Sequence, residues 1–138
     1  MSYFGSAEEV YGTLGRLITD VATDQDLGPR LCRADTVVRY EHSDPEATIT
    51  VRLREAVPVV VEFGPSSMDP EVILRMPADL AHRFWLGEIS LAVGLARGQI
   101  EAIGPVEKLL RLLPLANPAF PMYRRQLAAQ GRADLIVP

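Results

Sequence analysis

Few side chains in this sequence have the types and spacing that catalysis or metal binding requires. The two histidines, His42 and His82, fall on a predicted strand and a predicted helix. Neither belongs to an HxH or HxxE spacing of the kind that helps to hold zinc. We therefore expect both to be structural or solvated. Cys32, the single cysteine, has no recognisable His–Asp company and is expected to be a small buried residue.

The serine and glycine motifs give the same result. Ser66 and Ser67 in "GPSS" lack the glycine that follows serine in a nucleophile elbow, which favours a loop. "GEISLAVG" does not end in the Lys-Ser/Thr pair of a phosphate-binding loop. Asp69 and Glu71 fit a turn and the start of a strand. The sequence thus predicts no catalytic residue, no metal and no cofactor, and a protein that is not an enzyme.

Composition narrows the class of protein. The chain has 138 residues, of which 48% are hydrophobic and 23% charged, which is typical of a single globular domain over residues 1–138. A net charge of -4 argues against nucleic-acid binding, which needs a basic surface. No apolar run is long enough for a transmembrane segment. "MSYFGSAEEV" lacks the pattern of a signal peptide, and a lone cysteine favours a reducing, cytoplasmic setting.

The first half of the chain changes from helical to strand periodicity. Ser6 and Glu9 match a capping box, so a helix should start at Ala7, and a second short helix should contain Leu27 and Leu31. Strict alternation follows in "TVVRYEH", "TITVRLR" and "VPVVVEF", and "EVILRM" is a fourth strand. Pro58 marks an edge position or a strand start. Alternation of this kind indicates a sheet with one buried face, and a meander of three or four antiparallel strands.

Helical spacing returns at Pro77 and dominates the rest of the chain. The sequence predicts a helix that ends at Gly87, an apolar helix over 89–96, a short strand in "QIEAI", and helices over 106–113 and 122–130. The helix over 89–96 has no polar stripe, which predicts burial on every side, with a close backbone approach at Gly94. The predicted segments are N-terminal helices at about 6–34, a sheet with helices at about 35–113, and a C-terminal segment with a helix at 114–138.

The order of these elements resembles the sterol carrier protein family. The likeness runs from about Thr36 to Leu113, and "MDPEVILRMPADLAHRFWLGEISLAVGLARGQIEAIGPVEKLLRLL" carries most of it. Four of its residues match the family pattern, namely Gly87, Gly98, Ile100 and Gly104. The resemblance implies an α/β domain of the α+β type, with a five-stranded mixed, mostly antiparallel sheet covered on one face by helices. It also implies an apolar, lipid-binding cavity between the sheet and the helices.

Two functions follow from this pattern. The first is a non-enzymatic binding or carrier module for a fatty acyl chain, a sterol-like molecule or another lipid. The second is an accessory protein with a filled core, which forms a homodimer or assists a partner enzyme acting on a lipid-like substrate. Arg124 and Arg125 could meet a lipid head group, although an exposed helix face explains them better. The apolar candidates for ligand contact, each of which could equally be plain core, are Phe84, Leu91, Val93, Leu95, Leu113, Phe120 and Met122.

Overall fold

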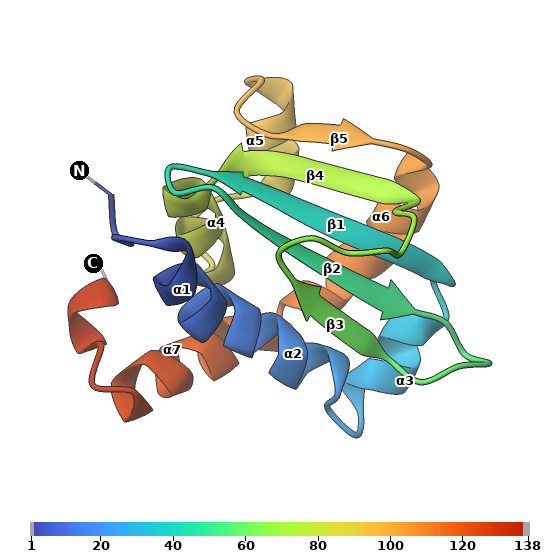
Figure 1. Ribbon diagram of the computed structural model, residues 1–138, viewed down its shortest axis with the longest axis horizontal. Coiled ribbons are helices and arrows are strands. Elements are labelled where there is room, and N and C mark those ends of the chain that lie inside the picture. Colours follow the sequence, from blue (N-terminus) through green and yellow to red (C-terminus); the bar gives the residue numbers. More distant parts are fainter. Residues whose placement is uncertain (1, 137–138) are drawn as a thin grey trace.

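The alternating residues form a five-stranded sheet in the computed structural model, which describes residues 2–136 (Figure 1). The strands lie in the order β3-β2-β1-β4-β5. Central strands β1 and β4 are parallel, and every other neighbouring pair is antiparallel. The predicted mixed, mostly antiparallel sheet is therefore confirmed. The strand bounds are β1 (Thr36–Ser43), β2 (Ala47–Leu53), β3 (Val60–Phe63), β4 (Val72–Pro77) and β5 (Glu101–Ile103).

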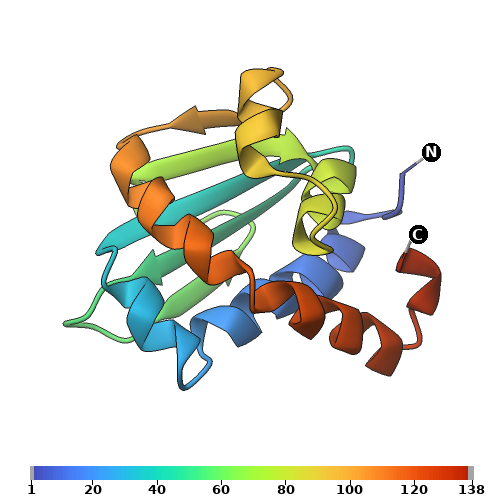
Figure 2. The ribbon, with the colours of Figure 1, turned by 180° about the vertical axis from the view of Figure 1, so that it is seen from behind.

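The register places the apolar residues of neighbouring strands on one face. Tyr40 in the central strand is paired with Ile49 on one side and Leu74 on the other. Because side chains alternate along a strand, all three point towards the same side of the sheet. Arg39 and Glu41 point to the opposite side, as the alternation predicts. Figure 2 shows that the helices cover the first of these faces.

The connection from β3 to β4 crosses the other face of the sheet. Gly64 donates its backbone N–H to the Thr48 carbonyl at 2.7 Å, and the Arg39 guanidinium donates to the Met68 carbonyl at 2.9 Å. This loop carries the chain past β2 and β1, so that β4 pairs with the far side of β1 (Figure 1). The antiparallel meander consequently stops at three strands. Pro58 lies just before β3, which is an edge strand, as its missing N–H predicts.

The first helix is continuous from Ala7 to Ala22 and contains one π-helical turn, η1. Its first element starts at Ala7, where the Ser6 hydroxyl accepts the Glu9 N–H at 3.3 Å, so the predicted cap is confirmed. The helix bounds are α1 (Ala7–Val10), η1 (Tyr11–Gly15), α2 (Arg16–Ala22), α3 (Leu27–Cys32), α4 (Ala78–Trp85), α5 (Leu91–Ala96), α6 (Val106–Leu112), η2 (Leu113–Ala116), α7 (Ala119–Ala129) and η3 (Ala133–Leu135). The last long helix thus begins at Ala119 rather than at the predicted Met122.

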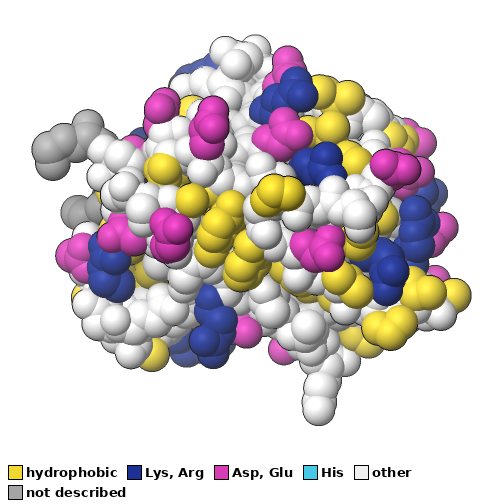
Figure 3. Space-filling model, in the orientation of Figure 1, with side chains coloured by type: hydrophobic (Ala, Val, Ile, Leu, Met, Phe, Trp, Pro, Cys, Tyr) yellow, Lys and Arg dark blue, Asp and Glu magenta, His cyan; other side chains and the backbone are white. Residues whose placement is uncertain are grey.

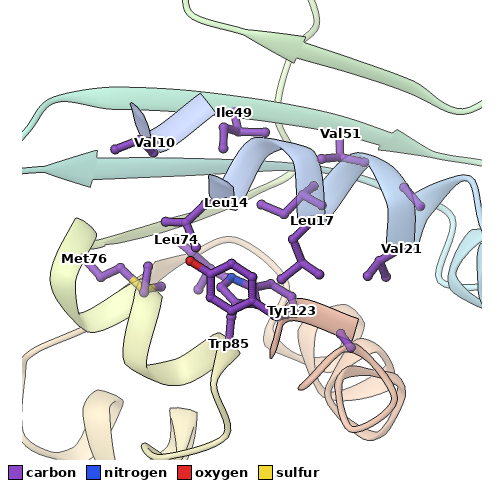
Figure 4. Close-up of a cluster of buried hydrophobic side chains, with 14 of the residues drawn as sticks. Val10, Leu14, Leu17, Val21, Ile49, Val51, Leu74, Met76, Trp85 and Tyr123 are labelled. Carbon is purple, nitrogen blue, oxygen red and sulfur yellow. The ribbon is translucent and has the colours of Figure 1, made fainter. Parts of the chain in front are cut away.

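The core fills the space between the sheet and the helices. Figure 4 shows side chains of α2, such as Leu17, facing those of the sheet above and those of α4 and α7 below. Leu14 and Ile49 are fully buried, and so is Tyr123 on α7. Burying apolar area of this extent is the main favourable contribution to the fold. The N-terminal helix is therefore an integral layer of the domain.

Helix α5 is much less buried than its composition predicts. It covers only Leu91–Ala96, and in it Leu91 and Gly94 are buried while Val93 is 43% exposed. Gly94 lies against the Ile100 side chain so closely that a Cβ would overlap it, so the predicted close approach is confirmed. The prediction of burial on every side is wrong. Two of the exposed residues, Ala92 and Ala96, are small and present little apolar surface to water, whereas the larger Val93 is exposed as well.

The face of the sheet that carries the crossing loop is polar. Arg75 pairs with Glu41 at 2.6 Å and with Glu101 at 2.9 Å, which links three neighbouring strands by ion pairs. Figure 3 shows acidic and basic side chains interspersed with apolar ones on this side of the molecule. Such a mixed surface offers no broad basic area to a nucleic acid.

Candidate functional site

Two apolar cavities lie between the sheet and the helices. The first, of about 60 Å³ and partly open, is lined by α2, α3, the end of α4, strands β1 and β2, and the segment from α6 to η2. The second, of about 50 Å³, is enclosed by α4, α5, strands β1 and β4, and the same segment. Their walls are almost entirely aliphatic and aromatic side chains. Space of this kind suits an apolar ligand rather than an ion.

The cavities share one boundary, formed by Tyr40, Trp85, Leu112 and Ala116. Tyr40 belongs to the sheet and Trp85 ends α4, whereas Leu112 and Ala116 belong to the covering segment. Movement of these few side chains would join the two spaces. We name the pair of spaces and their shared boundary the twin cavity.

The segment that covers the twin cavity is held less firmly than the other helices. In α6 only Leu109 is buried, and in η2 no residue is buried. In α7, by contrast, Tyr123 and Leu127 are completely inaccessible. Segments with few buried apolar contacts open at the lowest free energy. On this criterion α6 and η2, which form the cover, are the part of the wall expected to open most readily.

Besides the indole of Trp85, two polar side chains line the twin cavity, and both come from β1. Burial raises the pKa of Tyr40 to about 12, so its phenol stays protonated at neutral pH. His42 is only 5% exposed, and its Nδ1 lies 3.0 Å from the Ala47 carbonyl oxygen. A carbonyl can only accept, so Nδ1 carries the proton and Nε2 presents a lone pair. Among the described residues this buried Nε2 has no hydrogen-bond partner.

Burial lowers the pKa of His42 below its ordinary value, and the bond to Ala47 opposes this only in part. The imidazole is accordingly neutral at pH 7. The twin cavity therefore contains an uncharged hydrogen-bond acceptor in an otherwise apolar wall.

The sequence-based candidates divide between the cavity wall and other places. Phe84, Leu91 and Leu113 line the second cavity. Val93 and Leu95 do not line either cavity, although Leu95 packs against the core. The remaining two candidates lie on α7. Phe120 packs against Phe84, with ring centroids 5.9 Å apart, and Met122 faces an open surface hollow.

Sequence reasoning missed the shared boundary and the orphaned acceptor. Tyr40 and His42 carried a signal, because their spacing of two places both on the buried face of β1. Helical spacing puts Trp85 on one face with Leu80, Ala81 and Phe84, which predicts burial but not a cavity. Leu112 and Ala116 gave no signal that separates a cavity wall from ordinary packing.

The second histidine, His82, is fully satisfied. One ring nitrogen lies 2.7 Å from the Tyr123 hydroxyl and the other 2.7 Å from the Leu135 carbonyl oxygen. His82 thereby ties α4 to α7 and to η3, which is a structural role. Cys32 is buried, as predicted, and burial raises the pKa of its thiol. Arg124 donates to the Leu86 carbonyl at 2.9 Å, and Arg125 lies beside an open hollow.

Larger hollows occur at the surface, where they are open and lined partly by charged side chains. Three of them measure about 440, 460 and 490 Å³. Within residues 2–136, no three His, Cys, Asp or Glu side chains gather as a metal site would require. In the same part of the chain, every helix is too short or too polar to cross a bilayer.

Comparison with solved structures identifies the architecture. A sterol carrier protein domain 2 of Helicoverpa armigera matches with a TM-score of 0.65 and 14% identity, covering 82% of this chain and 89% of that one. Sterol carrier protein 2 from Yarrowia lipolytica, in its apo form, matches with a TM-score of 0.62 and 14% identity, over 77% and 88% of the two chains. This chain has the sterol carrier protein fold.

Another match with the sterol carrier protein fold is described as UbiJ-SCP2, a ubiquinone synthesis protein. Its TM-score is 0.56 at 18% identity, and the match covers 76% of this chain and 90% of that one. No family model matches the sequence, and no curated protein matches it either. At these identities the likeness is one of fold, so the site must be argued from this chain's own residues.

Proposed function

We propose that this protein is a non-enzymatic binding or carrier module for an apolar ligand, such as a fatty acyl chain or another lipid. The twin cavity is the observation that carries the proposal. It lies on the helix-covered face of the sheet, and its walls are apolar except for Tyr40, His42 and the indole N–H of Trp85. Solved proteins with this fold include sterol carrier proteins, which agrees with the proposal.

The small size of the cavities defines how binding would work. Neither reaches the roughly 300 Å³ of an ordinary ligand pocket. A chain-like ligand would push α6 and η2 outward and join the two spaces past Trp85. Each buried methylene contributes about 0.8 kcal/mol, so a chain of ten carbons supplies several kcal/mol towards this opening. We propose that the protein does this in the cytoplasm and delivers the ligand to a membrane or an enzyme.

Trp85 makes this proposal directly testable, because it is the single tryptophan and lies at the shared boundary. A bromine atom quenches indole fluorescence only on contact. Titration with 11-bromoundecanoic acid and 11-bromo-1-undecanol should therefore quench Trp85 in a saturable way at micromolar concentration. The matched control is Trp85→Phe combined with Val93→Trp, which moves the fluorophore to an exposed site. Quenching there should be weak and should not saturate.

The second candidate function, an accessory protein with a filled core, is favoured by a different observation. Val106 and Leu110 lie one helical turn apart on α6 and are 50% and 58% exposed. An apolar pair of this kind could contact a second copy or a partner enzyme. If neither bromo compound quenches Trp85 and the protein sediments as a dimer, this function replaces the carrier proposal.

A further inference from the structure

The unpaired nitrogen of His42 indicates what kind of ligand the twin cavity accepts. Buried polar groups almost always have a hydrogen-bond partner, and leaving one without a partner is unfavourable. His42 lines the second cavity, is 5% exposed, and has no partner for Nε2 among the described residues. A hydrogen-bond donor on a molecule bound inside the cavity would satisfy this nitrogen.

The bond on the other side of the ring decides the chemistry of that partner. The His42 Nδ1–H donates to the Ala47 carbonyl, which leaves Nε2 as an acceptor. A second acceptor, such as a ketone, an ether or an ester carbonyl, cannot pair with it. An ionised carboxylate has no proton to give and would bury its charge in an apolar space. A hydroxyl supplies the donor without charge.

We propose that the twin cavity selects an apolar molecule that bears a hydroxyl group, and that this hydroxyl donates a hydrogen bond to Nε2 of His42. The inference rests on the proposed function, since it assigns the head group of the ligand that the twin cavity binds. The hydrocarbon part extends from His42 along the second cavity towards Tyr40 and Trp85, which begin the first cavity.

Tyr40 is the natural comparison within the site. Tyr40 lies two residues from His42 on the same face of β1. The two rings are nearly parallel, with centroids 6.4 Å apart. The Tyr40 phenol is the other polar group that β1 contributes to the wall. A variant that removes the Tyr40 hydroxyl tests whether the ligand hydroxyl is recognised by His42 or by any polar group in the cavity.

The test uses three ligands of equal chain length, namely 1-decanol, decyl methyl ether and decanoate. Their affinities are measured by competition against the quenching of Trp85 by 11-bromo-1-undecanol. The wild type should bind decanol about three- to tenfold more tightly than the ether, which is the range of one hydrogen bond. Decanoate should bind more weakly than decanol. The preference for decanol should disappear in His42→Leu and persist in Tyr40→Phe.

A second measurement on the wild type keeps the test independent of whether His42→Leu folds. Nitrogen-15 NMR of the imidazole should show the Nδ1–H tautomer, and the Nε2 resonance should shift towards lower frequency with decanol but not with the ether. Equal affinity for decanol and ether, with no change at Nε2, would overturn the inference and leave the carrier function intact. A preference lost in Tyr40→Phe instead, or tighter binding of decanoate, would also overturn it. If the bromo compound does not quench at all, the carrier function fails as well.

Discussion

The surroundings of His42 and His82 differ in how many ring nitrogens have a hydrogen-bond partner. Both rings are buried, but His82 has a partner for each nitrogen, whereas His42 has a partner for only one. Around His82, the rings of Tyr3, Phe4 and Tyr123 fill the space within 5.5 Å of its centroid. Around His42 there is a cavity. The first environment is complete without a ligand, and the second is the one that we propose a ligand completes.

The largest effect is expected from removing the satisfied histidine. His82→Leu deletes two hydrogen bonds, so that the buried Tyr123 hydroxyl and the Leu135 carbonyl each lose the partner that His82 provides. Each buried group left unsatisfied costs about 1–3 kcal/mol, so the free energy of unfolding should fall by about 3 kcal/mol. Urea unfolding measures this directly. Tyr123→Phe and the double variant complete a cycle in which the two losses should not add. A loss below about 1 kcal/mol would contradict the structural role.

The next largest effect is expected from enlarging an alanine in the packed core, compared with enlarging an alanine that borders the twin cavity. Ala119 is completely inaccessible and lies outside the twin cavity, while Ala116 belongs to the shared boundary. Ala119→Leu should therefore be destabilising by about 1–3 kcal/mol because it overpacks the core. Ala116→Leu should change stability by less than about 1 kcal/mol and weaken quenching of Trp85 at least tenfold. Similar melting curves for the two variants would show that the twin cavity does not differ from the core.

A smaller effect should appear when the pH is lowered. Burial lowers the pKa of both His42 and His82 below the ordinary value of 6.5 in the folded protein. The unfolded chain therefore takes up protons first, so stability is constant above pH 6.5 and decreases as the pH falls from 6.5 through the folded values. Each histidine can contribute a slope of at most about 1.4 kcal/mol per pH unit. Urea unfolding at pH 7.5 and 5.5 should show this loss, and His42→Leu should reduce it. An unchanged loss in that variant would contradict the assignment.

The smallest effect is expected at the unsatisfied histidine. His42→Leu removes one hydrogen bond but also removes a buried acceptor that has no partner. These contributions oppose each other, so the free energy of unfolding without ligand should change by less than about 1 kcal/mol. Differential scanning calorimetry alongside His82→Leu checks the contrast. A loss as large as that of His82→Leu would show that both histidines are structural.

The sequence was sufficient to predict which face of a strand is buried, but not which strands lie next to one another. Alternation predicts that Ile49 and Val51 point into the core, because only the spacing of two matters. The same alternation cannot state that β4 pairs with the far side of β1, since this depends on the path of the crossing loop. Helix α5 shows a second limit, because apolar composition predicted burial where small side chains allow exposure.

The candidate site was predictable only in part, and for a related reason. Leu91 and Leu95 lie on the same short helix with the same side chain, yet only Leu91 reaches the cavity wall. Nothing in their spacing separates them. The orphaned Nε2 of His42 depends on the register that sets Ala47 opposite it. Unsatisfied groups and hollow spaces are properties of the three-dimensional packing, so the sequence pattern alone does not reveal them.

The parallel pairing of β1 with β4 has a consequence for how the protein folds. The hairpins from β1 to β3 join residues close in sequence, whereas Tyr40 meets Leu74 only after the whole meander and the crossing loop have been traversed. Contacts of such long range form slowly, because the chain must first lose the entropy of closing the loop. Since the second cavity needs both strands, its wall is completed late on the folding pathway. A ligand that binds only the finished wall should therefore slow unfolding while leaving the early steps of folding unchanged.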